Sequence, residues 1–266
     1  MHSVIDLGHF ATGAAMGSYM GSFVVHYWDT LSTNYVMTKT EADLGRFGRI
    51  AKFTKSVLTW QHTAKTFKSY IPVAGAIVPC RALSIAGYGY FQNLFMYQSG
   101  LDPMTAKFCG AIGSGVLLTM LSAPAEQVKT MLQLGSKRSL GVQALADSYR
   151  QYPTLAMRIV PTVTCMLFLT EYLQNRYTYD LFGANPLSMY TASILASGIS
   201  QIVATPFENL RIKQVQQGIE DKMSLLSRLK MLQTDGLLYK GFGMRVFGMS
   251  IQATSTLYLA YLFSNR

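Results

Sequence analysis

The chain has 266 residues, half of them hydrophobic and 14% charged, with a formal net charge of +10. The charged residues avoid long segments and collect in short ones, which disfavours a soluble protein and is typical of membrane proteins. The chain lacks a zinc or RNA-binding signature, so we expect no nucleic acid partner, and anionic lipid headgroups explain the positive charge better. Cys80, Cys109 and Cys165 lack CxxC spacing, so they indicate packing rather than a disulfide framework or a metal site. The N-terminus has no cleavable signal or Arg-rich presequence, so any organelle address would be internal.

Six segments are long and apolar enough to cross a bilayer, which takes about 20 helical residues. They are Leu7–Val36, Ile71–Ser99, Pro103–Gln133, Thr154–Gln174, Pro186–Gln217 and Gly243–Phe263. The first, third and fifth are longer and carry polar residues in their second halves, which suits helices around a water-accessible interior. We therefore predict an all-α membrane protein with six transmembrane helices.

The connections alternate in charge. The connections after the first, third and fifth segments are basic, whereas the other two are short and nearly neutral. By the positive-inside rule the basic connections share one side, and both termini lie on the other.

Small residues recur in the odd segments and predict close helix packing. They are Gly13, Gly17 and Gly21, then Gly110, Gly113 and Gly115, then Ala196, Ser197, Gly198 and Ser200. The first group is not a phosphate-binding loop, because it lacks the GK[ST] ending and a preceding strand.

One polar pattern occurs at the end of two odd segments. Pro206, Glu208, Arg211 and Lys213 follow one another at short helical spacing, and Pro124, Glu126 and Lys129 repeat the pattern. Each proline should kink its helix, because it removes a backbone donor and clashes with the preceding turn. The matches predict one domain over residues 1–266 with three repeats, at about 1–100, 101–182 and 183–266. In the third repeat, Leu225, Leu226, Leu229 and Leu232 give a short connecting helix an apolar face suited to the membrane interface.

These motifs resemble the signature of the mitochondrial carrier family, and the resemblance covers nearly the whole chain. The family's later elements are matched by Asp235-Gly236 and by Tyr239-Lys240-Gly241. The resemblance implies the carrier fold, with six helices in three pseudo-symmetric repeats in the mitochondrial inner membrane. It places both termini toward the intermembrane space and the basic loops toward the matrix.

The resemblance also implies a matrix gate, in which the acid and cation of neighbouring repeats form a ring of ion pairs. Its members here would be Asp29, Glu126, Lys129, Glu208 and Arg211, with Asp29 paired to Lys129 and Glu126 to Arg211. The first repeat departs from the pattern, because Tyr27 replaces the proline and Ser32 replaces a cation. In the second repeat Met131 replaces the second cation. Glu208 is therefore expected to face Ser32 and to have no partner.

The family's cytoplasmic gate is poorly preserved. Its acid and cation positions fall on Leu94 and Tyr97, on Glu171 and Gln174, and on Tyr258 and Tyr261, so only Glu171 is charged. We expect Glu171, Gln174, Tyr258 and Tyr261 to be the remnant of this gate.

Three arginines match the family's substrate-contact positions: Arg81, Arg158 and Arg245. Guanidinium groups bind carboxylate or phosphate, so they favour an anionic solute; lipid or carbonyl contacts near the membrane face are the alternative. Tyr239, Lys240 and Gly241 resemble a cardiolipin headgroup site, and a simple helix-start turn is the alternative.

Two functions follow as hypotheses. One is alternating-access transport of a small anionic metabolite. The other is a transport-inactive accessory subunit of a large inner-membrane complex, such as a respiratory assembly; a divergent relative in the outer membrane is a third possibility. His9, His26 and His62 lack metal-ligand spacing, and no catalytic arrangement is found, so we expect no enzyme, metal or cofactor.

Overall fold

The computed structural model describes residues 7–37, 60–135, 142–178, 186–217 and 224–264, and all regular structure within them is helical. The α-helices are α1 (Leu7–Met37), α3 (Trp60–Pro72), α4 (Val78–Tyr97), α5 (Pro103–Leu134), α6 (Val142–Arg150), α7 (Tyr152–Thr164), α8 (Thr170–Leu173), α10 (Pro186–Gln217), α11 (Leu225–Thr234) and α12 (Phe242–Ser264). The π-helical segments are η1 (Val73–Ile77), η2 (Cys165–Leu169) and η3 (Gln174–Thr178).

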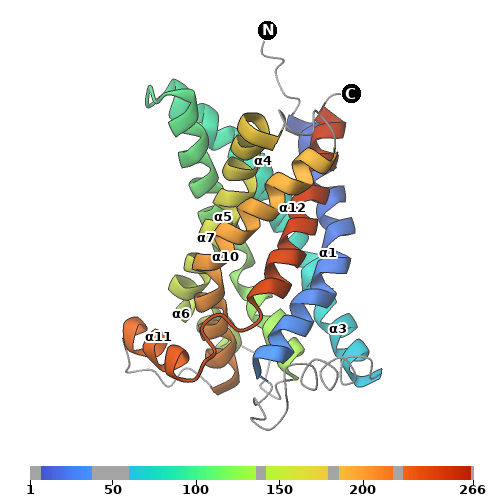
Figure 1. Cartoon of the computed structure of the whole chain (residues 1–266), viewed down its shortest axis with the longest axis vertical. Coiled ribbons are helices and arrows are strands. Elements are labelled where there is room, and N and C mark those ends of the chain that lie inside the picture. The colour runs from blue at the N-terminus through green and yellow to red at the C-terminus, as the bar shows by residue number, and fades with distance from the viewer. Residues whose placement is uncertain (1–6, 38–59, 136–141, 179–185, 218–223, 265–266) are drawn as a thin grey trace.

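The long helices close into a ring. α1 packs against α4, α4 against α5, α5 against α7, α7 against α10, α10 against α12, and α12 returns to α1. α1 begins and α12 ends at the same end of the bundle, which we call the terminus end (Figure 1). The opposite end, where α1 ends and α12 begins, is called the distal end.

Four of the described helices are long and apolar enough to cross a membrane: Thr66–Tyr97, Pro103–Leu134, Tyr152–Arg176 and Leu187–Gln216. They match four of the six predicted spans. The spans predicted at Leu7–Val36 and Gly243–Phe263 coincide with α1 and α12, and their membrane crossing stays a prediction.

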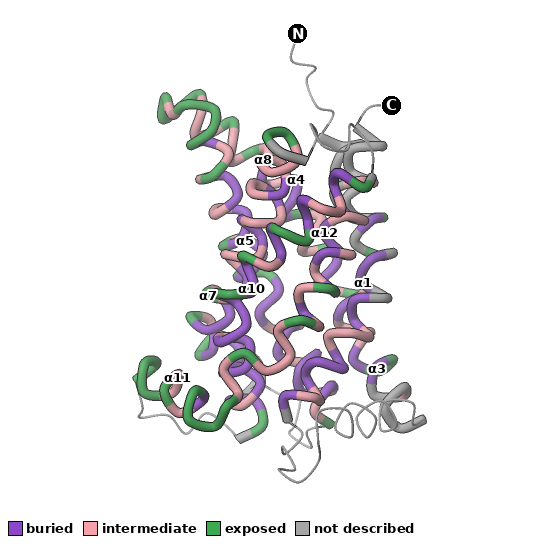
Figure 2. The backbone as a smooth tube through the Cα atoms, viewed as in Figure 1, coloured by how far each residue is buried: buried purple, intermediate pink, exposed green. Residues whose placement is uncertain are grey.

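The distribution of burial is inverted relative to a soluble protein. Large apolar side chains face outward, with Ile71 at 71% and Leu83 at 55% exposure, whereas Ser114, Thr130 and Asn209 are fully buried. Figure 2 shows the buried positions turned toward the neighbouring helices. In a bilayer this arrangement is favourable, because the outward apolar side chains meet lipid and the polar groups find partners inside.

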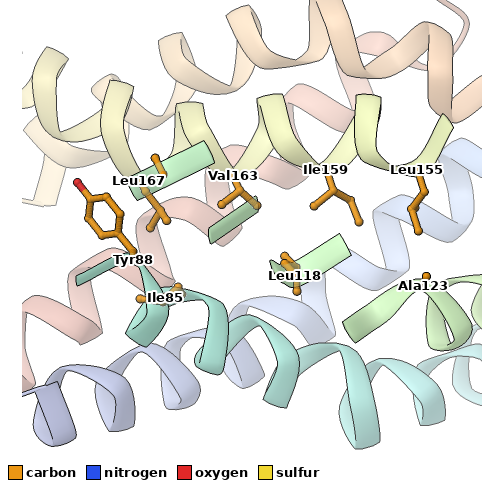
Figure 3. Packing of buried hydrophobic residues seen from close by; sticks show 9 residues of the cluster. Ile85, Tyr88, Leu118, Ala123, Leu155, Ile159, Val163 and Leu167 are labelled. Carbon is orange, nitrogen blue, oxygen red and sulfur yellow. The ribbon is translucent and has the colours of Figure 1, made fainter. Parts of the chain in front are cut away.

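One apolar cluster joins three neighbours in the ring. Ile85 and Tyr88 of α4, Leu118 of α5, and Ile159 and Val163 of α7 pack together in the half of the ring formed by these helices (Figure 3). The cluster holds α4, α5 and α7 side by side, and four of its members also line the interior of the ring: Ile85, Leu118, Ile159 and Val163.

The second helix starts earlier than predicted. The expected span began at Ile71, but α3, η1 and α4 form one continuous helix from Trp60. Pro72 would normally interrupt an α-helix by removing a hydrogen bond. The wider π-turn that follows accommodates this loss, so the chain stays helical.

The small-residue stripe of α1 faces α12. A Cβ atom at Gly17 would lie 2.5 Å from the Ser255 carbonyl oxygen, and one at Gly21 would lie 2.6 Å from Ser255 Oγ. The predicted close approach is therefore present here, and also at Gly110 beside Gln92. It is absent at Gly198, where an added Cβ would meet nothing within 4 Å.

Pro124 and Pro206 lie inside α5 and α10, each a continuous helix of 32 residues. The kink predicted at each proline stays a prediction.

Candidate functional site

A cavity lies inside the ring and is lined by residues of α1, α4, α5, α7, α10 and α12. The cavity has a volume of about 100 Å³. One water needs about 10–15 Å³ by this measure, so several waters or a small solute would fit. The lining carboxylates are Asp29, Glu126 and Glu208, and the lining cations are Arg81, Lys129, Arg158 and Arg245.

The first link of an ion-pair network joins α1 to α5. Lys129 Nζ lies 2.6 Å from Asp29 Oδ2, so these two residues are paired, and their role in a gate stays a prediction. Gln133, one turn further along α5, donates to the same carboxylate oxygen at 3.3 Å and to Thr30 Oγ1 at 3.1 Å. Two side chains of α5 therefore hold the one acid that α1 contributes.

The second link joins α5 to α10. Arg211 Nη2 lies 3.5 Å from Glu126 Oε2, and Arg211 Nε lies 3.0 Å from Glu208 Oε2 on its own helix. Arg211 also donates to the Glu126 carbonyl at 3.2 Å and to Thr130 Oγ1 at 2.6 Å. Its guanidinium group is 2% exposed and is fully committed to these contacts.

Arg158 of α7 joins the same two carboxylates. Its Nη2 lies 3.0 Å from Glu126 Oε2, and its Nε lies 3.2 Å from Glu208 Oε2. The second contact is a charge contact rather than an aligned hydrogen bond, because Nε has no hydrogen-bond partner by geometry. Arg158 therefore bridges α5 and α10 from a third helix.

The expectation that Glu208 faces Ser32 without a partner is wrong. Glu208 contacts Arg158 and Arg211, whereas Ser32 is fully buried with no hydrogen-bond partner for its hydroxyl among the described residues. The Ser32 side chain lies against the turn before α12, since a Cβ at Gly241 would be 2.7 Å from Ser32 Oγ. A buried carboxylate is stable only when paired, and a long arginine reaching from α7 provides the partner that position 32 lacks.

The other two arginines of the expected contact set have no hydrogen-bond or ion-pair partner in the described part of the chain. Arg245 is 7% exposed, and none of its three guanidinium nitrogens has a hydrogen-bond partner within the described residues. Arg81 is half-buried and makes no hydrogen bond or ion pair with any described residue. Three arginines thus line one cavity, but Arg158 is held by carboxylates while Arg81 and Arg245 are available to a ligand.

One ion pair lies toward the terminus end. Lys107 Nζ is 2.5 Å from Glu171 Oε1, so the acid of the expected cytoplasmic-gate remnant has a partner on α5 rather than on a neighbouring even helix. Gln174 begins η3, and Tyr258 lies half-buried in α12. Tyr261 falls in the last part of α12, and its side chain lies outside the described residues.

The turn before α12 is fastened to α1 and α10. Lys240 Nζ lies 3.5 Å from the Val36 carbonyl oxygen and 4.9 Å from the centre of the Tyr35 ring. Gly241 has a φ of +83°, which disfavours residues with a Cβ, and Asn209 Nδ2 contacts the carbonyls of residues 237, 238 and 240 within 3.2 Å. Tyr239 is exposed at 48%. The lipid-binding role of Tyr239, Lys240 and Gly241 stays a prediction.

Sequence reasoning missed the pairing of Arg158, the contact of Gln133 with Asp29, and Lys107. Gln133 had a signal, because it lies one helical turn after Lys129 and so on the same face. No sequence pattern indicated that Lys107 pairs with Glu171, because the two residues are 64 positions apart. His26 of α1 is buried against α3, with its Nε2 lying 2.8 Å from Ser69 Oγ. Among the described residues no group of three His, Cys, Asp or Glu side chains could hold a metal ion.

The geometry defines a class: a helical protein with apolar outer faces and a charged cavity along its axis. No protein-family profile matches the chain. A stretch of 120 residues is 23% identical to the mitochondrial RNA-splicing protein MRS4 of Saccharomyces cerevisiae, covering 45% of this chain and 39% of that protein. The chain therefore matches less than half the length of this relative.

Proposed function

We propose that the chain is a divergent mitochondrial carrier that moves a small anionic metabolite across the inner membrane by alternating access. MRS4 is a mitochondrial carrier-family protein, so the distant similarity supports a carrier-like protein. The closed ring of helices, the cavity inside it and the ion-pair network at its distal end are the features that such a mechanism needs.

The proposal includes the arrangement in the membrane. It takes all six long helices as spans, in three repeats, with the termini in the intermembrane space and the distal end toward the matrix. The matrix side would be closed by the ion-pair network of Asp29, Glu126, Lys129, Glu208 and Arg211. The opposite side would be closed by Glu171, Gln174, Tyr258 and Tyr261, with Lys107 as the cation that pairs with Glu171.

The unpaired guanidinium group of Arg245 carries the proposal. A buried charge without a partner costs several kcal/mol in effective desolvation, so proteins seldom retain one without use. Arg245 lines the cavity with Arg81, and a carboxylate or phosphate entering there would supply the missing partner. A small anion is therefore the solute class that the cavity favours.

Transport is tested by reconstituting the purified protein in liposomes and measuring exchange of labelled carboxylates and phosphates. We expect uptake of at least one anion, loss of that uptake in Arg245→Met, and little change in Lys230→Met. Lys230 is the matched control because it is an exposed cation on α11, away from the cavity. Uptake that persists in Arg245→Met would overturn the assignment of the site.

The second candidate is a transport-inactive accessory subunit of a large inner-membrane complex. It is favoured by the terminus end, where the described gate positions Leu94, Tyr97 and Tyr258 are uncharged and one ion pair, Lys107–Glu171, bridges the helices. Stoichiometric co-purification with such a complex, together with no uptake of any anion tested, would select this function.

Membrane lipids are the remaining proposed partner. The backbone around Tyr239-Lys240-Gly241 opens α12, where a helix N-terminus favours a negatively charged group. An anionic headgroup such as that of cardiolipin would bind there. The Lys240 ammonium group is already engaged with the end of α1, and the Lys240 and Phe242 amides donate to the Leu237 and Tyr239 carbonyls, so amides later in the first turn of α12 would make the main contacts.

A further inference from the structure

The ion-pair network lacks one link of a threefold ring. Lys129 joins α5 to the Asp29 carboxylate of α1, and Arg211 joins α10 to the Glu126 carboxylate of α5. By the same rule a cation at position 32 of α1 would join the Glu208 carboxylate of α10, but Ser32 stands there. Within the described residues no ion pair joins α1 to α10.

We propose that Arg158 is a positioning residue that supplies this third cation from α7 and so completes the charge balance of the network. Three carboxylates (Asp29, Glu126 and Glu208) then face three cations (Lys129, Arg158 and Arg211). Arg158 is the one of these cations that comes from outside the repeated motif. It contacts Glu126 at 3.0 Å and Glu208 at 3.2 Å, so one side chain serves the acids of two helices.

The position of Arg158 has a functional consequence. Its side chain is 16% exposed and lines the cavity, whereas the Arg211 side chain is 2% exposed and does not line it. A carboxylate or phosphate in the cavity can therefore reach Arg158 but not Arg211, and Arg158 is more exposed there than Lys129, whose side chain is 7% exposed. An anion that binds Arg158 competes directly with Glu126 and Glu208, and so weakens the link between α5 and α10. This consequence rests on the proposed transport function, but the charge balance itself does not.

The charge balance predicts an unusual pattern of rescue. Arg158→Gln leaves Glu126 and Glu208 with Arg211 as their one shared arginine, and a buried uncompensated charge is strongly destabilising. Removing the Glu208 charge as well restores the balance. The Arg158→Gln/Glu208→Gln double variant should therefore be more stable than Arg158→Gln alone, although it carries one more substitution.

The test is a double-mutant cycle read by thermal unfolding of the purified protein in detergent. We expect Arg158→Gln to lower Tm by about 10 °C, and the double variant to recover at least about half of that loss. Arg158→Lys, which keeps the charge, should lose less than Arg158→Gln. Arg81→Gln is the matched control, because Arg81 lines the same cavity without an ion pair. Its effect should be small and should add to that of Glu208→Gln.

Additive losses for Arg158→Gln and Glu208→Gln would overturn the proposal, because they would show that the two charges do not depend on each other. If Arg158→Gln does not accumulate as folded protein, recovery of folded yield in the double variant replaces Tm as the readout, and no recovery overturns the proposal. The cycle needs no transport. A protein that transports nothing can still show the coupling, and a working carrier with an additive cycle would refute this role of Arg158 alone.

Discussion

Replacing Arg245 by methionine should stabilise the empty protein. The guanidinium group is 7% exposed and has three nitrogens without a hydrogen-bond partner among the described residues. An unsatisfied buried polar group costs about 1–3 kcal/mol. Methionine is apolar, flexible and of similar length, so Arg245→Met removes this cost without opening a large cavity.

The size of the effect follows from the size of the protein. Water in the cavity and the nearby Glu208 charge offset part of the cost, so we expect a gain of about 1–3 kcal/mol rather than a full ionic desolvation energy. For a chain of this length 1 kcal/mol shifts Tm by about 2–4 °C. Arg245→Met should therefore raise Tm by roughly 2–10 °C.

The assay is thermal unfolding in detergent, with and without an added anion. Inorganic phosphate or citrate should raise the Tm of the unsubstituted protein, because a ligand that binds the folded state stabilises it. The same anions should stabilise Arg245→Met less. Arg158→Met is the matched control; it should lower Tm, because Arg158 is paired with two buried carboxylates.

Two results would refute this reasoning. If Arg245→Met lowers Tm as Arg158→Met does, then Arg245 has a partner that stabilises the fold. If phosphate or citrate stabilises Arg245→Met as much as the unsubstituted protein, the anion binds elsewhere. The effect of Arg245 on the stability of the protein would then be independent of anion binding.

Three further substitutions test packing and capping. Gly17→Leu should lower the folded yield, because its side chain would collide with α12, whereas Gly198→Leu faces open space and should not; equal yields would contradict the close approach. Asn209→Leu removes contacts with three carbonyls worth about 1–2 kcal/mol together, so hydrogen exchange in the turn before α12 should accelerate, and unchanged exchange would count against this role. Asp102 caps α5, and hydrogen bonds from Thr105 and from the Met104 amide hold its pKa below the ordinary value. Its stabilisation is full above the ordinary carboxyl pKa and is lost as pH falls through the lowered pKa, so Asp102→Asn should flatten the acid side of the stability profile; an unchanged profile would exclude Asp102 as its source.

The helical architecture could be predicted because it depends on local properties of the chain. The spans predicted from Ile71, Pro103, Thr154 and Pro186 fall on helices long and apolar enough to cross a membrane. The α-helical period also places Glu208 and Arg211 on one face, and the structure pairs them at 3.0 Å. The start of the second helix could not be predicted, since Pro72 normally interrupts a helix and its tolerance depends on a π-turn.

The sequence by itself therefore determined the helices, the apolar outer faces and the ring acids, because periodicity and apolar length act within one segment. Only the tertiary structure decided which cation neutralises which acid. Because Ser32 stands at the cation position of the first repeat, the sequence predicted no partner for Glu208. A buried carboxylate is stable only beside a cation, and Arg158 of α7 lies within contact distance of it. The same geometry leaves Arg245 without a hydrogen-bond partner among the residues that the structure describes, which no spacing in the sequence reveals.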